Sequence, residues 1–204
     1  LELVYGPIHR LASEISPVGH FNTYIRSDYR ITQIKEITAD TSPITGLVYD
    51  ISGGGSMKQA EGWKNARSSF ADLPLNFGYF EPKTGSGKRP LIIWLHGAGE
   101  GGQDTRVAYT GNKVVSLSSD EFQKYFGGAY VLAPQCPTMW MDDGSEQYTQ
   151  SGKSKYVTAL KALIDEFIAA NEAIDTNRIY IGGCSNGGFM TMRMIVDYPG
   201  FFAA

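Results

Sequence analysis

The segment Gly182–Gly188 (GGCSNGG) constrains the fold of this chain more than any other part of its sequence. It follows the short apolar run Ile179–Ile181 and precedes a methionine-rich stretch that continues to about Tyr198. The run predicts a strand and the stretch predicts a helix. A turn that passes directly from a strand into a helix leaves no room for side chains on either side of its central residue, which explains the glycines.

The central residue of that turn is Ser185, in the pattern Gly183-x-Ser185-x-Gly187. Gly-x-Ser-x-Gly between a strand and a helix is typical of a nucleophile elbow, in which the serine hydroxyl projects above the sheet. The N-terminus of the following helix also favours negative charge there. The alternative is an ordinary glycine-rich turn. Because both flanking elements match, we predict that Ser185 is a catalytic nucleophile.

A second glycine-rich segment, His96–Gly99, follows the apolar run Leu91–Leu95, which is typical of a strand buried on both faces. Acyl transfer passes through an oxyanion, which two backbone N–H groups can stabilise. We predict that Asn186, the residue after the serine, provides one of these groups. Ala98 is expected to provide the other, with Gly99 as the next candidate and as a residue beside the substrate.

Gly97, Gly99 and Gly102 also fit the dinucleotide-binding pattern Gly-x-Gly-x-x-Gly. Such a site requires a helix that begins inside the glycines and an acidic residue about 20 positions later, at the end of the next strand. Here a predicted loop follows, and Asp120 falls at the start of a predicted helix, so we reject this interpretation. His96 precedes the loop and is expected to be structural rather than a general base.

From about residue 75 onward the pattern predicts strands that alternate with helices. Strands are expected at Asn76–Phe80, Leu91–Leu95, Ala129–Ala133 and Ile179–Ile181. A short helix through Phe126 is expected to begin at a capping box of Ser118 and Glu121. A longer helix over 155–171 is indicated by apolar residues at helical spacing, namely Tyr156, Leu160, Leu163, Ile164 and Phe167. This alternation predicts a parallel sheet with right-handed crossovers.

Residues 1–70 differ from the rest of the chain. They are rich in Ser, Thr, Gly and Ile, and stretches such as 29–34 (YRITQI) alternate as half-buried strands do. We therefore predict a β-rich N-terminal extension over residues 1–70 and the N-terminal part of a catalytic domain over residues 71–204.

The composition excludes several classes of function. The 204 residues hold 18 Lys and Arg against 21 Asp and Glu, with no basic stripe, so no nucleic-acid partner is expected. No apolar run approaches the roughly 18–20 residues of a membrane span, so no membrane partner is expected either. The two cysteines, Cys136 and Cys184, lack metal-ligand spacing, and we favour free thiols over a disulfide. No metal or organic cofactor is expected.

Four ordered segments carry a resemblance to a known group of proteins: Leu91–Gly102 (LIIWLHGAGEGG), Val131–Pro137 (VLAPQCP) with Trp140, Arg178–Gly188, and Tyr198–Ala203 (YPGFFA). They resemble α/β-hydrolases described as predicted peptidases, which lie close to the polyhydroxybutyrate depolymerases, feruloyl esterases and acetylxylan esterases. The resemblance covers about residue 75 to the end. It implies a three-layer α/β-hydrolase sandwich with a mostly parallel sheet, incomplete at its C-terminal side.

The resemblance also implies roles for single residues. It agrees with Ser185 as nucleophile and with Ala98 and Asn186 as the oxyanion hole, and it places Trp140 near the substrate cleft. Packing in the core is an equally supported interpretation of Trp140. Members often carry an immunoglobulin-like domain ahead of the hydrolase domain, so residues 1–70 are expected to be the end of such a domain or a family-specific extension.

The catalytic triad is incomplete in this sequence. In this fold the chain order is Ser, then Asp or Glu, then His. After Ser185, Asp197 lies on the helix that directly follows the turn, and no histidine occurs beyond His96. We expect the sequence to be a fragment of a longer enzyme, with the acid and then the histidine within about 100 further positions. The alternatives are a second chain that supplies both residues, and a truncated, inactive protein.

These features predict a serine hydrolase that cleaves carboxylic esters, small or linked to a polysaccharide or polyester, through a Ser185 acyl-enzyme. The first residue is Leu, which is consistent with removal of a signal peptide, and a secreted or periplasmic location is expected. One alternative is a serine exopeptidase on the same fold. The other is a non-catalytic glycan-binding module that uses exposed aromatic side chains such as Trp63, Trp140 and Tyr148.

Overall fold

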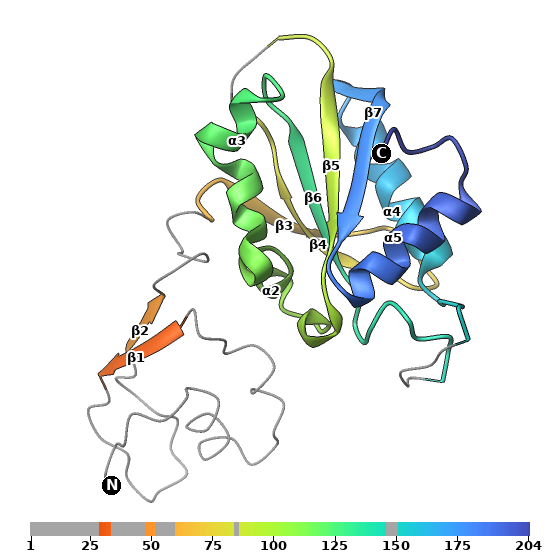
Figure 1. Cartoon of the computed structure of the whole chain (residues 1–204), viewed down its shortest axis with the longest axis horizontal. Coiled ribbons are helices and arrows are strands. Elements are labelled where there is room, and N and C mark those ends of the chain that lie inside the picture. Colours follow the sequence, from red (N-terminus) through yellow and green to blue (C-terminus); the bar gives the residue numbers. More distant parts are fainter. Residues whose placement is uncertain (1–28, 34–47, 52–59, 84–85, 146–150) are drawn as a thin grey trace, which may run out of the picture.

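The computed structural model describes residues 29–33, 48–51, 60–83, 86–145 and 151–204. Its centre is a mixed five-stranded sheet in the order β3–β4–β6–β5–β7 (Figure 1). These strands are β3 (Trp63–Arg67), β4 (Asn76–Phe80), β5 (Arg89–Leu95), β6 (Tyr130–Gln135) and β7 (Ile174–Gly183). A separate antiparallel pair consists of β1 (Tyr29–Gln33) and β2 (Val48–Ile51).

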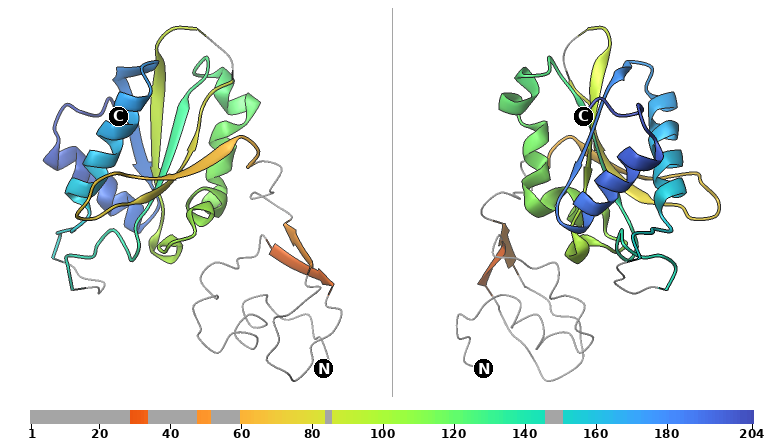
Figure 2. Two further views of the ribbon diagram at one scale, coloured as in Figure 1. Left: turned by 180° about the vertical axis from the view of Figure 1, so that it is seen from behind. Right: turned by 45° about the vertical axis from the view of Figure 1, so that its right-hand side comes forward.

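Helices cover both faces of the five-stranded sheet and make three layers. One face carries α2 (Thr105–Thr110), the 3-10 helix η3 (Gly111–Ser118) and α3 (Asp120–Lys124). The other face carries α4 (Val157–Ala170) and α5 (Asn186–Asp197), so that the green and blue helices of Figure 2 lie on opposite sides of the strands. A short 3-10 helix, η2 (Ala98–Glu100), follows β5. The three-layer α/β sandwich predicted from the sequence is confirmed.

The strands β5, β6 and β7 run parallel, as the alternation of strands and helices predicts. Their carboxyl ends therefore meet at one edge of the sheet, and Leu95 at the end of β5 pairs with Gly183 at the end of β7. The strands β3 and β4 extend the sheet with antiparallel pairs. Because β3 precedes residue 70, the sheet includes residues on both sides of the predicted domain boundary, which stays a prediction.

The core explains why β5 is apolar almost throughout. Alternate residues of a strand face opposite layers. Leu91, Ile93 and Leu95 pack in the cluster that includes the buried face of α4, whereas Trp94 packs with Val114 and the rest of the second cluster under α2 and η3. The face that α4 buries is formed by Ala159, Leu160, Leu163, Ile164 and Phe167. Four of these five are among the positions whose helical spacing predicts this helix.

Several observed element boundaries differ from the predicted ones, most clearly those of β6 and β7. Strand β6 ends at Gln135 rather than at Ala133, and it continues through Pro134, which lies beyond the last residue pair with β5. Strand β7 begins at Ile174, which pairs with Arg89 at the start of β5. The polar residues between Ile174 and the apolar run Ile179–Ile181 show no strand pattern, so the sequence did not predict this part of the strand.

The predicted capping box at Ser118 is wrong by one residue. The N-cap of α3 is Ser119, whose hydroxyl accepts a hydrogen bond from the Phe122 N–H at 3.2 Å. Ser118 belongs to η3 instead. Its hydroxyl donates to the Val115 carbonyl at 2.7 Å and accepts from Trp63 Nε1 at 2.8 Å. Trp63 lies far from Ser118 in the sequence, so the local pattern around Ser118 could not predict this hydrogen bond.

The two cysteines are free thiols, as predicted. Cys136 is buried directly after β6, and burial raises the pKa of its thiol well above the ordinary value. Cys184 is half-buried in the turn that follows β7. The sulfur atoms therefore make no covalent link between these two strand ends.

Removal of a buried side chain from α4 tests the core packing. We expect Leu163→Ala to lower the free energy of unfolding by about 2–5 kcal/mol, because it leaves a cavity against the sheet. Thr158→Ala, at an exposed position of the same helix, is the matched control and is expected to change it by less than about 0.5 kcal/mol. Urea unfolding of both variants measures the difference, and equal effects would contradict the assigned packing.

Candidate active site

Ser185 lies in the turn between β7 and α5 and is exposed to solvent. Its backbone has φ 52° and ψ −110°, a conformation that side-chain-bearing residues rarely adopt. Such a conformation costs about 1–3 kcal/mol and persists only where the surrounding structure enforces it. Since Ser185 is also the N-cap of the twelve-residue helix α5, the helix N-terminus favours negative charge at this position.

The turn is enforced by direct packing of backbone on backbone. A Cβ at Gly187 would lie 2.0 Å from the Leu95 carbonyl oxygen, and a Cβ at Gly183 would lie 2.5 Å from the Gly187 carbonyl carbon. The Cys184 N–H donates to the Leu95 carbonyl at 3.1 Å. Glycines on both sides of Ser185 thus allow the turn to rest on the end of β5, a contact that the sequence pattern does not identify.

The loop His96–Gly99 lies beside this turn. It continues β5 at the same edge of the sheet, and a Cβ built at Gly97 would be 3.6 Å from the Cys184 carbonyl oxygen. Ala98 is exposed and Gly99 is half-buried, both within η2. The structure therefore places the predicted residues Ser185, Ala98, Gly99 and Asn186 at neighbouring strand ends.

The backbone N–H groups at this edge have different surroundings. The Gly97 N–H donates to Glu100 Oε2 at 2.7 Å. Within the described residues, the N–H groups of Ala98 and Asn186 donate no hydrogen bond. These are the two N–H groups that the sequence predicts for the oxyanion hole.

His96 is buried, with 1% of its surface exposed, and burial lowers its pKa from 6.5 to about 4. The Cys136 N–H donates to His96 Nε2 at 3.1 Å. That nitrogen therefore carries no proton, and the Nδ1 proton is donated to the Gly97 carbonyl oxygen at 2.6 Å. His96 is neutral and fully engaged, which fits the structural role expected from the sequence.

Trp140 is completely buried, with 0% of its surface exposed. Its backbone N–H donates to Asn186 Oδ1 at 2.6 Å, and its indole Nε1 donates to the His96 carbonyl at 3.1 Å. It packs edge-on against the ring of Tyr156 at 5.9 Å. Of the two interpretations of Trp140, this placement matches core packing, and the residue connects the serine turn to the His96 loop.

The segment that carries Trp140 is held by a buried carboxylate, Asp142, with 0% of its surface exposed. Asp142 Oδ2 accepts from Thr138 Oγ1 at 2.7 Å and forms an ion pair with Lys155 Nζ at 2.8 Å. The Gly144 N–H donates to Oδ1 at 2.8 Å. These contacts compensate the burial of the charge. Because they tie Asp142 to Thr138, Gly144 and Lys155, they fix the course of the segment around Trp140.

The aromatic residues proposed for glycan binding are largely enclosed. Besides the buried Trp140, Trp63 is half-buried, stacks on Tyr109 at 4.6 Å between ring centroids, and donates its Nε1–H to Ser118. Tyr148 lies outside the described residues.

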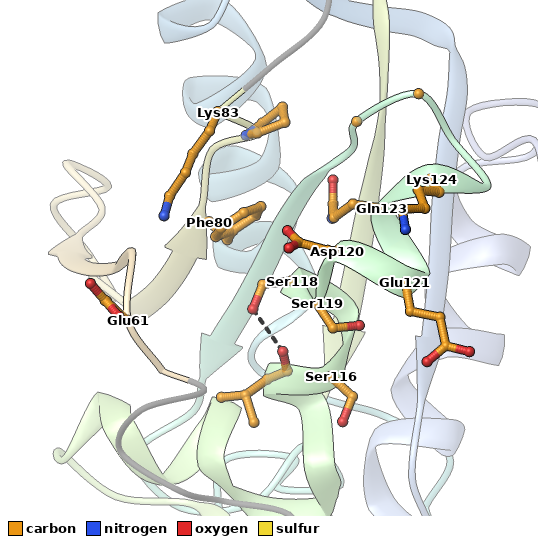
Figure 3. A pocket seen from close by; sticks show the side chains of 14 residues that line it. Glu61, Phe80, Lys83, Ser116, Ser118, Ser119, Asp120, Glu121, Gln123 and Lys124 are labelled. Atoms are coloured by element: carbon orange, nitrogen blue, oxygen red, sulfur yellow. Dashed lines mark hydrogen bonds between the residues drawn. The ribbon is translucent and has the colours of Figure 1, made fainter.

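A cavity of about 1060 Å³ (Figure 3) lies beside α3 and the amino end of β6, whereas Ser185 follows the carboxyl end of β7. It is lined by Phe80 at the end of β4 and by Gly128 just before β6, together with charged side chains of both signs, such as Lys83 and Asp120. Neither Ser185 nor the His96–Gly99 loop contributes to it. The cavity is therefore separate from the candidate active site.

Two further properties of the described part of the chain bear on its chemistry. No three His, Cys, Asp or Glu side chains among these residues come together in a group that could hold a metal ion. None of the helices in the described ranges is both long and apolar enough to cross a membrane.

Sequence reasoning missed Glu100 and Asn112. The Glu100 carboxylate is buried, with 2% of the residue exposed, and accepts from the Gly97 N–H and from Asn112 Nδ2 at 2.7 Å each. A signal was present, since Glu100 stands three residues after Gly97, the spacing at which an acidic side chain reaches back to a helix N-cap.

Comparison with known proteins agrees with this geometry. A family model described as Phospholipase/Carboxylesterase matches residues 83–203. A poly(3-hydroxybutyrate) depolymerase from Ralstonia pickettii is 30% identical over 135 residues, which are 62% of this chain and 27% of that protein. Acetylxylan esterase A from Emericella nidulans is 26% identical over 144 residues, which are 67% of this chain and 43% of that protein.

Among solved structures, the crystal structure of a thermostable esterase matches with a TM-score of 0.64 and 28% sequence identity. The match covers 72% of this chain and 40% of the esterase. This chain thus spans less than half the length of each of these relatives.

Two glycines of the turn give a matched test of its packing. We expect Gly187→Ala to lower the free energy of unfolding by about 3 kcal/mol or more, because the new methyl group meets the Leu95 carbonyl. Gly188→Ala is the control, since its Cβ would lie 3.6 Å from the nearest atom, an ordinary contact. Thermal unfolding of both variants measures the effect. Similar melting temperatures would show that the turn does not rest on β5.

The low pKa of His96 predicts a dependence of stability on pH. As the pH falls below 6.5 the unfolded chain takes up a proton at His96, while the folded chain does not until about pH 4, so stability falls over this interval. Between pH 6.5 and 4.5 the loss should be roughly 2 kcal/mol larger than in His96→Gln, which has no such group. Urea unfolding at both pH values gives the comparison, and parallel losses would refute the assignment.

Proposed function

This chain belongs to the phospholipase/carboxylesterase family of α/β-hydrolases, and on that premise we propose that it carries the nucleophile and the oxyanion hole of a serine hydrolase that cleaves carboxylic esters. The observation that supports the proposal best is the backbone of Ser185. An exposed serine with positive φ, between two glycines that cannot carry a side chain, has the geometry of a nucleophile elbow.

In the proposed mechanism Ser185 Oγ attacks the carbonyl carbon of the ester as its proton passes to a general base. The carbonyl oxygen becomes an oxyanion, which accepts hydrogen bonds from the Ala98 and Asn186 N–H groups. The bond to the alcohol oxygen then breaks, and the alcohol leaves with the proton. Water attacks the acyl-enzyme in the same way, releasing the acid and restoring the serine hydroxyl.

The general base is not His96, because that side chain is buried and both of its ring nitrogens are engaged by backbone groups. We propose that a histidine and its acidic partner are contributed by a further segment of the protein. Two observations support this: the triad order of the fold places both residues after the serine, and the chain spans only part of its relatives.

The proposed substrates are esters whose acyl or alcohol part belongs to a polymer. The names of the relatives support this choice, since one is a poly(3-hydroxybutyrate) depolymerase and another an acetylxylan esterase. Both names describe cleavage of an ester bond in or on a polymer. The half-buried or buried state of Trp63 and Trp140 gives no support to a glycan-binding module without catalysis.

The test is the reaction of Ser185 in the full-length protein. We expect a fluorophosphonate probe to label the wild-type protein, and Ser185→Ala to abolish labelling and to lower hydrolysis of p-nitrophenyl acetate by at least about 10³-fold. Cys184→Ser is the control for the neighbouring half-buried thiol and should keep both activities. Labelling that persists in Ser185→Ala would reject the nucleophile. Faster turnover of aminoacyl-naphthylamides than of esters would indicate a peptidase instead.

A further inference from the structure

We propose that Glu100 is a positioning residue of the oxyanion hole, whose buried carboxylate orients the loop so that the Ala98 N–H is presented to the substrate oxygen. This inference rests on the proposed function. It concerns a residue that does not contact the substrate and acts through the backbone of Gly97.

Glu100 holds Gly97 from both sides. The Gly97 N–H donates to Glu100 Oε2 at 2.7 Å, and the Glu100 N–H donates to the Gly97 carbonyl at 3.2 Å. The His96 Nδ1 proton adds a second hydrogen bond to the same carbonyl. The backbone of Glu100 is itself fixed, because Gln135 Nε2 donates to the Glu100 carbonyl at 2.9 Å. Both peptide groups that flank Gly97 are therefore held by hydrogen bonds.

The orientation of Ala98 follows from the planarity of the peptide bond. The Gly97 carbonyl and the Ala98 N–H belong to one trans peptide unit and point in opposite directions. Since the carbonyl is held toward His96 and the Glu100 N–H, the Ala98 N–H must point the other way. With the Gly97 N–H bound to Glu100 as well, the Ala98 N–H is the first donor of the loop that remains for a substrate.

The Glu100 carboxylate also contacts η3. Asn112 adopts a left-handed conformation with φ 50° and donates its Nδ2 to Glu100 Oε1 at 2.7 Å. A Cβ at the preceding Gly111 would lie only 2.4 Å from Oε1. Both carboxylate oxygens are thus occupied by donors, one from the oxyanion loop and one from η3. This second contact fixes the direction in which the carboxylate can accept the Gly97 N–H.

The donor pattern suggests a swap experiment in the full-length protein. In Glu100→Gln the amide oxygen can accept the Gly97 N–H, but its NH₂ group then faces the Asn112 NH₂ group. In the double variant Glu100→Gln with Asn112→Asp, the glutamine NH₂ group faces a carboxylate, and the donor–acceptor pairing is restored. Asp tolerates the left-handed conformation as Asn does, so the backbone at position 112 is unchanged.

For p-nitrophenyl acetate we expect Glu100→Gln to lower kcat by about 10- to 100-fold. This loss is no larger than the loss caused by removing one oxyanion-hole donor, because the Ala98 N–H is displaced rather than removed. The KM should change by less than about 3-fold. The double variant should recover kcat to within about 3-fold of the wild type. The affinity for a trifluoromethyl ketone, whose adduct carries the oxyanion, should fall and recover in parallel. Thermal unfolding reports the folded fraction of each variant.

The outcomes separate the two proposals. Wild-type kcat in folded Glu100→Gln, or a double variant that recovers its melting temperature but not its kcat, overturns the positioning role alone. If Glu100→Gln does not fold, the double variant decides: recovery of both properties supports the role, and recovery of folding alone overturns it. A wild-type protein that neither hydrolyses esters nor reacts with a fluorophosphonate overturns the proposed function, and the positioning role with it.

Discussion

The contact between the serine turn and the end of β5 is the constraint on which the rest of the candidate site depends. The Cys184 N–H binds the Leu95 carbonyl, and Gly187 packs so closely on the same carbonyl that no side chain fits. Because β5 and β7 are parallel neighbours, this contact brings the turn after β7 beside the loop after β5. The strained backbone of Ser185 is held by this packing, because a serine rarely adopts a positive φ unless the surrounding structure enforces it.

Around this contact the protein uses buried polar groups whose hydrogen bonds are directed at backbone atoms. His96 binds the Gly97 carbonyl and the Cys136 N–H, and Trp140 binds the His96 carbonyl and the Asn186 side chain. Each unmade bond of this kind would cost about 1–3 kcal/mol, so the partners fix one another. The result is a rigid backbone at both turns, which is what stabilisation of an oxyanion by main-chain N–H groups requires.

Much of this could be predicted from the sequence, because it depends on local patterns. Gly183, Ser185 and Gly187 identify the turn, and the spacing of Leu160 and Leu163 identifies α4. What escaped prediction depends on contacts between distant segments. The Ser118 hydroxyl accepts a hydrogen bond from the Trp63 indole, and the Glu100 carboxylate accepts one from the Asn112 side chain in η3. Trp140 has an aromatic side chain that suits a cleft or a core equally well, and only the packing decides between them.

The same contacts imply that the core and the candidate site form one mechanical unit. Leu95 contributes its side chain to the cluster beneath α4, while its carbonyl supports the serine turn. Met190 and Met194 anchor α5 in that cluster, and α5 begins at Ser185. A joint displacement of β5 and β7 would therefore move both turns together and preserve their relative geometry. A displacement of β5 against β7 would separate them, and the ladder of backbone hydrogen bonds between these two strands resists that motion.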